Sequence, residues 1–230
     1  MFHNSIAIIT ARGGSKRILH KNIKPFCGKP ILCYSIEAAK KSGQFNEVMV
    51  STDDPEIAEL AVRAGASVPF IRSAGAADDY ASTDDVIREV LSMYEKEGRY
   101  FDAFCCIYPT APFITASRLT QAMQLLEETD SVMPVVAFSY PVQRAMIIEN
   151  GNLSRKWPEY ANSRSQDLEP YYHDAGQFYP CRTDAFLREG TTDTQQMKPM
   201  ILKETEVQDI DTYEDWELAE LKYRRLHNEA

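Results

Sequence analysis

The chain has 230 residues, of which 44% are hydrophobic and 26% are charged, and its formal net charge at pH 7 is -9. This length and composition predict one folded domain with a sizeable core and argue against intrinsic disorder. The negative charge argues against a general nucleic-acid-binding protein, which would carry a basic face. No apolar run approaches the roughly 20 residues of a membrane span, so we expect no membrane partner. The five cysteines lie scattered without a Cys-x-x-Cys motif, and we expect reduced thiols in a cytoplasmic protein.

Short apolar runs alternate with amphipathic helical patterns along the chain. The runs are rich in Val, Ile and Phe, which is typical of buried parallel strands, and strands are expected over residues 5–10, 47–52, 67–71, 101–108, 131–138 and 175–182. Helices are expected over residues 54–65, 82–94, 119–126 and 211–227. This alternation predicts an α/β fold with a doubly wound, mostly parallel sheet, whose ligands bind at the carboxyl ends of the strands.

The alternation breaks over residues 140–173, which are polar, carry aromatic residues and show few clean periods. A stretch of this length without a regular pattern is either functional or a surface for a partner. We therefore expect a single domain over residues 1–230, with residues 140–173 as an excursion from it.

The segment Thr10–Asn22, TARGGSKRILHKN, gathers cations around two glycines directly after the first expected strand. The glycines let the backbone approach a ligand closely, and their N–H groups can form an anion-binding nest. Arg12, Lys16 and Lys21 add positive charge that suits phosphate oxygens. The segment matches neither the Walker A motif nor GxGxxG. It predicts a site for a polyanionic small molecule, most simply a nucleoside triphosphate; the alternative is a solvated surface loop.

Near the end of the chain, Asp209 and Asp211 flank one apolar residue, Ile210. In an extended segment, residues two apart point to the same side, so both carboxylates can face one cation while Ile210 faces the core. Mg²⁺ prefers oxygen ligands and usually takes one or two carboxylates together with phosphates and water. The pair therefore predicts a Mg²⁺ site. The alternative is a role at the start of the last helix, where Thr212 and Asp215 have capping-box spacing.

Several motifs resemble, in the same order, those of the cytidylyltransferases that activate nonulosonic acids, a family that includes the CMP-sialic acid synthetases and their pseudaminic acid relatives. The resemblance is carried by ARGGSKRILHKN with IKPFCGKPIL, VSTDDPEIAELAVRAGA, YPTAPF and VQDIDTYEDWELAE, and it spans nearly the whole chain. KPFCGKPI, the NSRSQDLE…YYHDAGQFY block and the VQDIDT ending are more similar to the pseudaminic acid branch. The resemblance implies a Rossmann-like nucleotidyltransferase that moves CMP from CTP to the anomeric hydroxyl of an acidic nine-carbon sugar. Pyrophosphate leaves, and Mg²⁺ is required.

The resemblance also implies roles for residues at the matching positions. Nucleotide binding is expected of Arg12, Gly13, Gly14, Ser15, Lys16, Lys21, Asn22, Arg72 and Ser82. Catalysis is expected of Arg12, Lys16, Lys21 and Asp211, and metal binding of Asp209 and Asp211. Sugar binding is expected of Tyr108, Arg164, Gln166, His173, Asp174 and Gln177. The excursion is expected to form a homodimer and to help line the partner's sugar site.

Some roles remain open at this point. Ser82 could serve only as a helix cap, and Asp53 matches a family position near the active site without a defined role. Tyr108 stands where the sialic acid enzymes commonly have glutamine, and Arg17 where they usually have glycine, so the acceptor sugar is uncertain. The alternatives are a cytidylyltransferase for sialic, legionaminic or ketodeoxyoctonic acid, and a non-catalytic nucleotide-binding module. An NAD-dependent dehydrogenase is disfavoured because GxGxxG is absent. The proton acceptor is open between a metal-bound hydroxide and Asp211.

Overall fold

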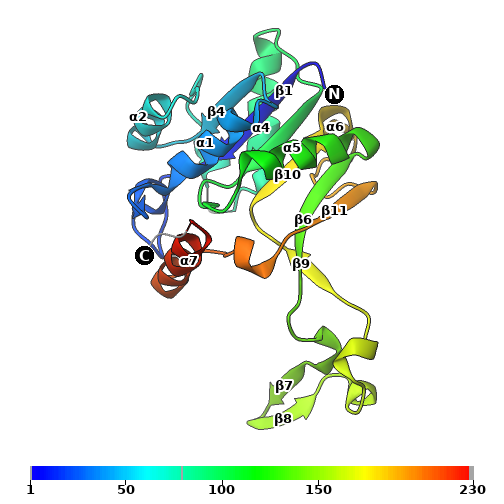
Figure 1. Ribbon diagram of the computed structural model, residues 1–230. Coiled ribbons are helices and arrows are strands. Elements are labelled where there is room, and N and C mark those ends of the chain that lie inside the picture. The colour runs from blue at the N-terminus through cyan, green and yellow to red at the C-terminus, as the bar shows by residue number, and fades with distance from the viewer. Residues whose placement is uncertain (1, 79, 228–230) are drawn as a thin grey trace.

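The fold is organised by a seven-stranded mixed sheet, and the computed structural model describes residues 2–78 and 80–227 (Figure 1). The strand order is β11-β6-β10-β5-β1-β4, with β9 paired to β6. The strands are β1 (Ser5–Thr10), β4 (Glu47–Ser51), β5 (Ala103–Ile107), β6 (Ser131–Ala137), β9 (Tyr172–Asp174), β10 (Phe178–Arg182) and β11 (Met197–Ile201). Strand β1 is parallel to β4 and β5, β11 is parallel to β6, and β10 is antiparallel to both of its neighbours. The predicted α/β fold with a mostly parallel sheet is confirmed.

One expected strand is wrong. Residues 67–71 form no strand, and Ser67 makes only an isolated parallel bridge with Met49. The Ser67 N–H donates to the Val48 carbonyl and the Ser67 carbonyl accepts from the Val50 N–H, each at 2.9 Å. Pro69, two residues on, has no N–H to donate, so the ladder stops there and β4 remains the edge strand.

Helices cover both faces of the sheet, as the doubly wound fold requires. On one face lie α1 (Ile31–Ser42), α2 (Pro55–Arg63) and α5 (Ala116–Leu125), and on the other α4 (Thr83–Lys96) and α6 (Thr183–Glu189). Successive side chains of a strand point to opposite faces. Ala7 and Ile9 of β1 therefore join the core under the first group, and Ile6 and Ile8 join the core under the second. Within the described residues, 2–78 and 80–227, every helix is too short or too polar to cross a bilayer.

The expected helix caps fix the starts of α2 and α4. The Asp54 carboxylate accepts hydrogen bonds from the N–H groups of Glu56 and Ile57. Ser82 forms a capping box with Asp85, in which each side chain bonds the other residue's backbone. Each such cap typically stabilises a fold by about 1 kcal/mol. Both helices therefore begin at a defined point near the carboxyl edge of the sheet.

The last helix, α7 (Tyr213–His227), packs on the segment that follows β1. This segment holds the turn η1 (Lys21–Ile23) and the short strands β2 (Pro25–Phe26) and β3 (Lys29–Pro30). A small third core joins the two regions and contains Ile18, Phe26, Ile31, Tyr34, Phe113, Ile210, Trp216 and Ala219. The Lys24 ammonium also lies over the rings of Tyr213 and Trp216, at 5.2 and 5.5 Å from their centroids. This packing holds residues 209–211 beside the turn after β1.

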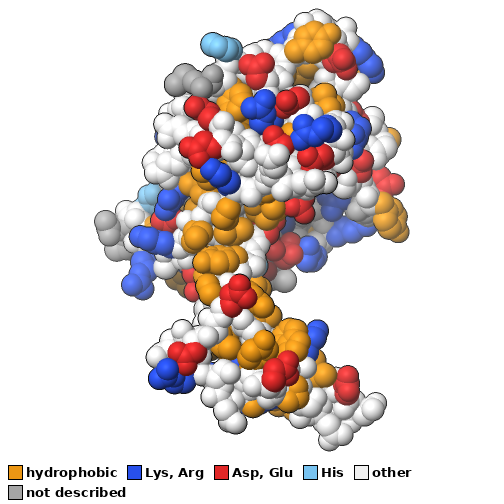
Figure 2. Space-filling view, turned by 90° about the vertical axis from the view of Figure 1, so that its right-hand side faces the viewer, with side chains coloured by type: hydrophobic (Ala, Val, Ile, Leu, Met, Phe, Trp, Pro, Cys, Tyr) orange, Lys and Arg blue, Asp and Glu red, His pale blue; other side chains and the backbone are white. Residues whose placement is uncertain are grey.

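Residues 140–173 project from the body as an arm (Figure 1). The arm carries a hairpin of β7 (Met146–Glu149) and β8 (Asn152–Arg155), and the paired strands β6 and β9 form its neck. Short helical segments complete the chain, namely α3 (Ala74–Ala77), η2 (Leu126–Glu128), η3 (Val142–Arg144), η4 (Pro158–Tyr160), η5 (Ser165–Asp167) and η6 (Glu204–Glu206). The arm leaves Tyr140, Ile148 and Leu153 at 85%, 75% and 64% exposure, and Figure 2 shows hydrophobic side chains gathered where it joins the body. Apolar exposure of this kind marks an interaction surface.

Candidate active site

A cleft of about 650 Å³ lies at the carboxyl end of β1. Strand β1 sits between β4 and β5 and is parallel to both, so the sheet order reverses at this point. Ligands of open α/β sheets bind at such switch points. Most of the expected nucleotide and metal residues line the cleft, together with one expected sugar residue: Arg12, Ser15, Lys16, Lys21, Asn22, Arg72, Ser82, Tyr108 and Asp211. The fold thus brings together side chains from opposite ends of the chain.

The turn after β1 is held in place by two polar side chains. The Gly13 N–H donates to Asp53 Oδ1 at 2.9 Å, which gives Asp53 the role of anchoring the turn. Asn22 is buried, and its amide Nδ2 donates to the Arg12 carbonyl at 2.8 Å. Asn22 therefore closes the turn through the backbone of Arg12, in addition to lining the cleft.

Gly13 and Gly14 differ in the space around them, which gives a matched pair of variants. A Cβ added to Gly13 would lie 2.6 Å from Asp54 Oδ2 and 2.9 Å from Asp54 Cβ, whereas a Cβ on Gly14 would meet no atom within 4 Å. Because Asp54 caps α2, we expect Gly13→Ala to displace that cap and to destabilise the fold by about 1 kcal/mol or more. Gly14→Ala should change the melting temperature much less. Thermal unfolding followed by circular dichroism checks this, and equal effects of the two variants would contradict it.

The acidic segment faces the turn. Ile210 is buried at 1% exposure, as expected, and Asp211 Oδ1 lies 2.7 Å from Arg17 Nη2 and 3.7 Å from Lys21 Nζ. The Lys21 ammonium also donates to the Ile210 carbonyl at 2.7 Å. Burial lowers the pKa of Lys21, and the carboxylates of Asp211 and Asp209 oppose this effect. Positive and negative groups from the two ends of the chain therefore meet in one cleft.

The donor set fits a divalent cation that is shared with a phosphate ligand. Burial raises the pKa of Asp209, and the nearby Asp211 carboxylate raises it further, so a cation between them would relieve repulsion. Among residues 2–78 and 80–227, no three His, Cys, Asp or Glu side chains gather into a metal site of their own. Mg²⁺ commonly takes only one or two carboxylates and completes its shell with phosphates and water.

The capping alternative for this segment is also borne out by the geometry. The Asp215 carboxylate accepts hydrogen bonds from the N–H groups of Asp211 and Thr212, at 3.1 and 2.8 Å, and the Thr212 hydroxyl accepts one from the Asp215 N–H at 3.2 Å. Asp215 thus fixes the backbone that carries Asp211, and it leaves the Asp211 side chain facing the cations. The helix cap and the ion pairs with Arg17 and Lys21 therefore involve different carboxylates.

The opposite wall of the cleft is formed by residues beside β4 and α4. Arg72 is buried at 6% exposure, with Nε donating to Ser51 Oγ at 3.0 Å and Nη2 to the Ser51 carbonyl at 2.6 Å. Burial lowers the pKa of Arg72, and the Asp53 carboxylate opposes this effect. Ser82 caps α4 and also lines the cleft, so its two expected roles are compatible.

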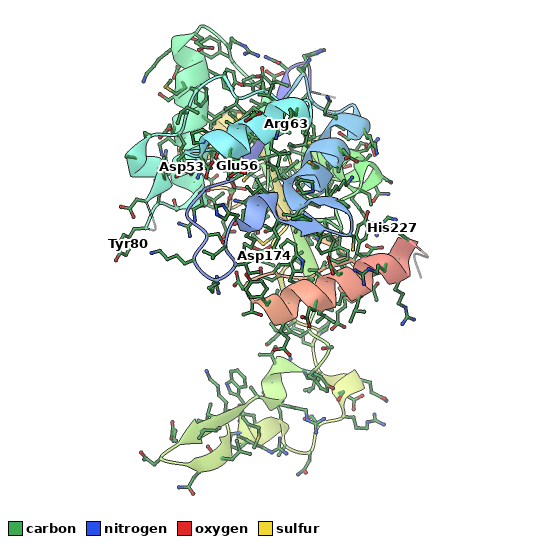
Figure 3. The ribbon with its side chains drawn as sticks, turned by 90° about the vertical axis from the view of Figure 1, so that its left-hand side faces the viewer. Asp53, Glu56, Arg63, Tyr80, Asp174 and His227 are labelled. Atoms are coloured by element: carbon green, nitrogen blue, oxygen red, sulfur yellow. The ribbon has the colours of Figure 1, made fainter. Side chains whose placement is uncertain are left out.

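Residues expected to bind the sugar fall into two groups. Tyr108, Asp174 and Gln177 lie at the same carboxyl edge of the sheet as the cleft, and Figure 3 labels Asp174 between Asp53 above it and the arm below it. Gln177 is buried, and its Nε2 donates to the Glu206 carbonyl at 2.7 Å. His173 is on β9, where its Nδ1 lies 2.8 Å from the Asp174 carbonyl oxygen and its ring 4.9 Å from that of Phe138.

The second group is in the arm. Arg164 is paired with Asp167 at 2.7 Å, with 73% of its side chain exposed, and Gln166 belongs to the adjoining turn η5. Neither residue lines the cleft of its own chain. His173, Asp174 and Gln177 do not line it either, so of the six expected sugar residues only Tyr108 does.

Sequence reasoning gave no individual role to several other residues that line the cleft, namely Thr10, Arg17, Ala76, Asp78, Ala81, Thr83, Val86, Pro109 and Thr110. Arg17 belongs to the cationic segment and Pro109–Thr110 follows a strand end, so their positions in known motifs could have indicated them. Val86 looks like an ordinary residue of a helix start, and only the packing of α4 beside the cleft reveals it.

Comparison with known proteins agrees with this geometry. A family model described as Cytidylyltransferase matches residues 6–225. The chain belongs to the cytidylyltransferase family. This cytidylyltransferase is 40% identical over 229 residues to the pseudaminic acid cytidylyltransferase of Campylobacter jejuni, with 98% of this chain and 99% of that protein covered. It is 34% identical over 234 residues to the CMP-N,N'-diacetyllegionaminic acid synthase of Legionella pneumophila, with 98% of both chains covered. The family resemblance carried by the motifs is confirmed.

Solved structures agree on the fold of the cytidylyltransferase. CMP:2-keto-3-deoxy-manno-octonic acid synthetase, solved with CTP, superposes with a TM-score of 0.70 at 17% identity, over 97% of this chain and 99% of that one. The 4-diphosphocytidyl-2C-methyl-D-erythritol synthase of Anaerococcus prevotii gives 0.65 at 13% identity, over 96% and 99%. At these identities the likeness establishes the architecture alone.

Proposed function

We propose that this cytidylyltransferase transfers CMP from CTP to the anomeric hydroxyl of an acidic nine-carbon sugar, most simply pseudaminic acid, and releases pyrophosphate. The observation that carries the proposal is the meeting of the glycine turn and its cations with Asp211 in one cleft at the switch point. A triphosphate needs both positive charge and a divalent ion. The cleft offers cations from the first loop and the Asp211 carboxylate from the segment before α7, while Asp209, two residues earlier, is outside the lining.

In this proposal the protein contributes positioning and charge neutralisation. The N–H groups of the turn, with Arg12, Lys16 and Lys21, hold the triphosphate so that the α-phosphorus faces the acceptor hydroxyl. Charge that develops on the departing pyrophosphate is stabilised by the same cations. Asp209 and Asp211 would hold Mg²⁺, which supplies further charge neutralisation on the phosphates. Arg72 and Ser82 contact the nucleoside in this proposal, which is supported by their position in the lining of the cleft.

The choice of pseudaminic acid is supported by the 40% identity to the Campylobacter jejuni protein, and a legionaminic, sialic or ketodeoxyoctonic acid acceptor is the alternative. The test is pyrophosphate release with CTP, Mg²⁺ and a panel of these sugars. We expect the highest kcat/KM with pseudaminic acid. A higher value with another sugar of the panel would reassign the acceptor, and no release with any of them would overturn the proposed reaction.

We further propose that the arm forms a homodimer and carries Arg164 and Gln166 to the cleft of the partner subunit. This arrangement is supported by the exposed apolar side chains of the hairpin and by the absence of these two residues from the lining of their own cleft. An arginine can pair with the sugar carboxylate through two parallel hydrogen bonds, which gives both affinity and orientation.

Mixed dimers test whether the site is shared. The Arg164→Ala and Lys21→Ala variants should each have low turnover when expressed alone. Their coexpression should recover turnover, because one of the two clefts in a mixed dimer then has Lys21 from one chain and Arg164 from the other. The control is coexpression of Lys21→Ala with Asp211→Asn, which both change the body and should recover nothing. Light scattering of the wild-type protein gives the oligomeric state. A monomer, or equal behaviour of the two coexpressed pairs, would contradict the shared site.

A further inference from the structure

A buried tyrosine outside the expected site joins two residues within it. Tyr179 of β10 is 8% exposed, and its hydroxyl donates to Asp174 Oδ2 at 2.7 Å. The centroid of its ring is 5.3 Å from that of Tyr108, in an edge-on arrangement. The other oxygen of Asp174, Oδ1, accepts a hydrogen bond from the Gly176 N–H at 2.9 Å. The Asp174 carboxylate is thus held at both of its oxygens.

The topology of the sheet places Tyr179, Asp174 and Tyr108 beside the cleft. Strand β10 is antiparallel to β5, so it begins where β5 ends, and the Tyr108 N–H donates to the Gln177 carbonyl at 2.8 Å. Asp174 pairs with Val135 near the carboxyl end of β6. Tyr108 lines the cleft, and its hydroxyl oxygen lies 3.4 Å from Thr83 Oγ1. A connected set of contacts therefore runs from the cleft to the neck of the arm.

Together, Tyr179 and Asp174 provide a carboxylate that is held in place and can accept hydrogen bonds. Burial, followed by the proximity of Tyr108 and Asp174, raises the pKa of Tyr179 far above its usual value, so the hydroxyl stays protonated and donates. An ionised carboxylate has about four lone-pair positions, and Tyr179 and Gly176 use two of them. Asp174 itself is exposed. The free positions can accept hydrogen bonds from a hydroxyl or acylamino group of a sugar.

We propose that Tyr179 is a positioning residue of the acceptor site, whose hydroxyl fixes the Asp174 carboxylate and whose ring supports Tyr108. Asp174 then accepts a hydrogen bond from the sugar, beside the part of the cleft that Tyr108 lines. This inference rests on the proposed function and adds to it the residue that orients the acceptor group. Tyr179 acts through Asp174 and Tyr108 and touches no reacting atom.

The test is Tyr179→Phe, which keeps the ring beside Tyr108 and removes only the hydroxyl. One hydrogen bond to a charged group corresponds to about a tenfold change in affinity, so the KM of the acceptor sugar should rise about tenfold. The KM of CTP should stay within about twofold, because Tyr179 itself does not line the cleft and its ring beside Tyr108 is kept. Asp174→Asn should raise the acceptor KM similarly, and the double variant should add little to either single change, as expected of residues that act as a unit.

Tyr94 provides a matched control at the opposite end of the strands of the same sheet. Tyr94 also donates a hydrogen bond to a carboxylate, Glu47 Oε1 at 2.5 Å, but Glu47 begins β4 and so lies at the amino end of the parallel strands. Tyr94→Phe removes the same kind of bond from a similarly buried ring. It should lower the melting temperature at least as much as Tyr179→Phe does, and it should leave the acceptor KM unchanged.

The outcomes separate this inference from the function on which it rests. A selective rise in the acceptor KM for Tyr179→Phe and Asp174→Asn, absent in Tyr94→Phe, supports the positioning role. Tyr179→Phe with an unchanged acceptor KM, or with equal rises for both substrates, overturns it while the wild-type enzyme remains active. A wild-type protein that releases no pyrophosphate with any sugar of the panel overturns the proposed function and this inference together.

Discussion

Lys21→Ala should lower turnover with CTP by at least about 100-fold, typical for the loss of one charge-stabilising group in an active site. The side chain is 19% exposed and its ammonium sits 3.7 Å from Asp211 Oδ1, so solvent cannot replace it well. Its removal takes away a cation from the proposed phosphate site. It also removes a positive charge that balances the negative charges of Asp209 and Asp211. The measurement is kcat for pyrophosphate release at saturating CTP and acceptor.

Lys24→Ala is the matched control for this variant. Lys24 follows the same turn, but its ammonium lies over the rings of Tyr213 and Trp216 and does not line the cleft. We expect a stability loss of about 0.5–1 kcal/mol from the lost cation–π contacts and turnover within a few-fold of wild type. Near-normal turnover of Lys21→Ala, or equal losses in both variants, would show that Lys21 has no special role at the phosphates.

Asp211→Asn should also lower turnover by about 100-fold. The change removes a carboxylate charge from the proposed metal site and from Arg17 and Lys21, and it keeps the size of the side chain. We expect higher Mg²⁺ concentrations to be needed for half-maximal turnover, since a neutral amide oxygen binds Mg²⁺ more weakly than a carboxylate does. A Mg²⁺ titration of the turnover rate, for variant and wild type, measures both effects.

Asp215→Asn provides the comparison within the same segment. This carboxylate caps α7 and accepts hydrogen bonds from the N–H groups of Asp211 and Thr212, so its change affects the helix start. It should lower the melting temperature, and it should change turnover and the Mg²⁺ requirement much less than Asp211→Asn does, because the Asp211 carboxylate is kept. If Asp215→Asn shifts the Mg²⁺ requirement as far as Asp211→Asn does, the assignment of Asp211 as the ligand is wrong.

The architecture and the main cleft could be predicted from the sequence because they depend on local patterns. Alternating apolar runs and helix caps such as Asp54 and Ser82 fix the elements, and the parallel sheet then places strand ends on one edge. Thr10–Asn22 follows β1 directly, so its position at the cleft follows from the chain order. The prediction failed at residues 67–71, where β-branched and aromatic residues suited a strand but Pro69 prevents the ladder from continuing.

Other features depend on contacts between distant segments, which a single sequence does not contain. Nothing near Tyr179 in the sequence indicates that its hydroxyl meets Asp174 or that its ring meets Tyr108, because those contacts require β10 to enter the sheet antiparallel to β5. The placement of Arg17 against Asp211 likewise requires α7 to pack on the segment after β1. The arm residues Arg164 and Gln166 were expected in a sugar site, and the structure leaves them outside the cleft of their own chain.

A crystal structure of the protein with CTP tests the central claim most directly. We expect the triphosphate to lie within hydrogen-bonding distance of the N–H groups of Gly13 and Gly14 and of the Lys21 ammonium, with the divalent ion between the phosphates and Asp211. A triphosphate bound elsewhere on the molecule, or Asp209 and Asp211 turned away from the nucleotide, would contradict the account.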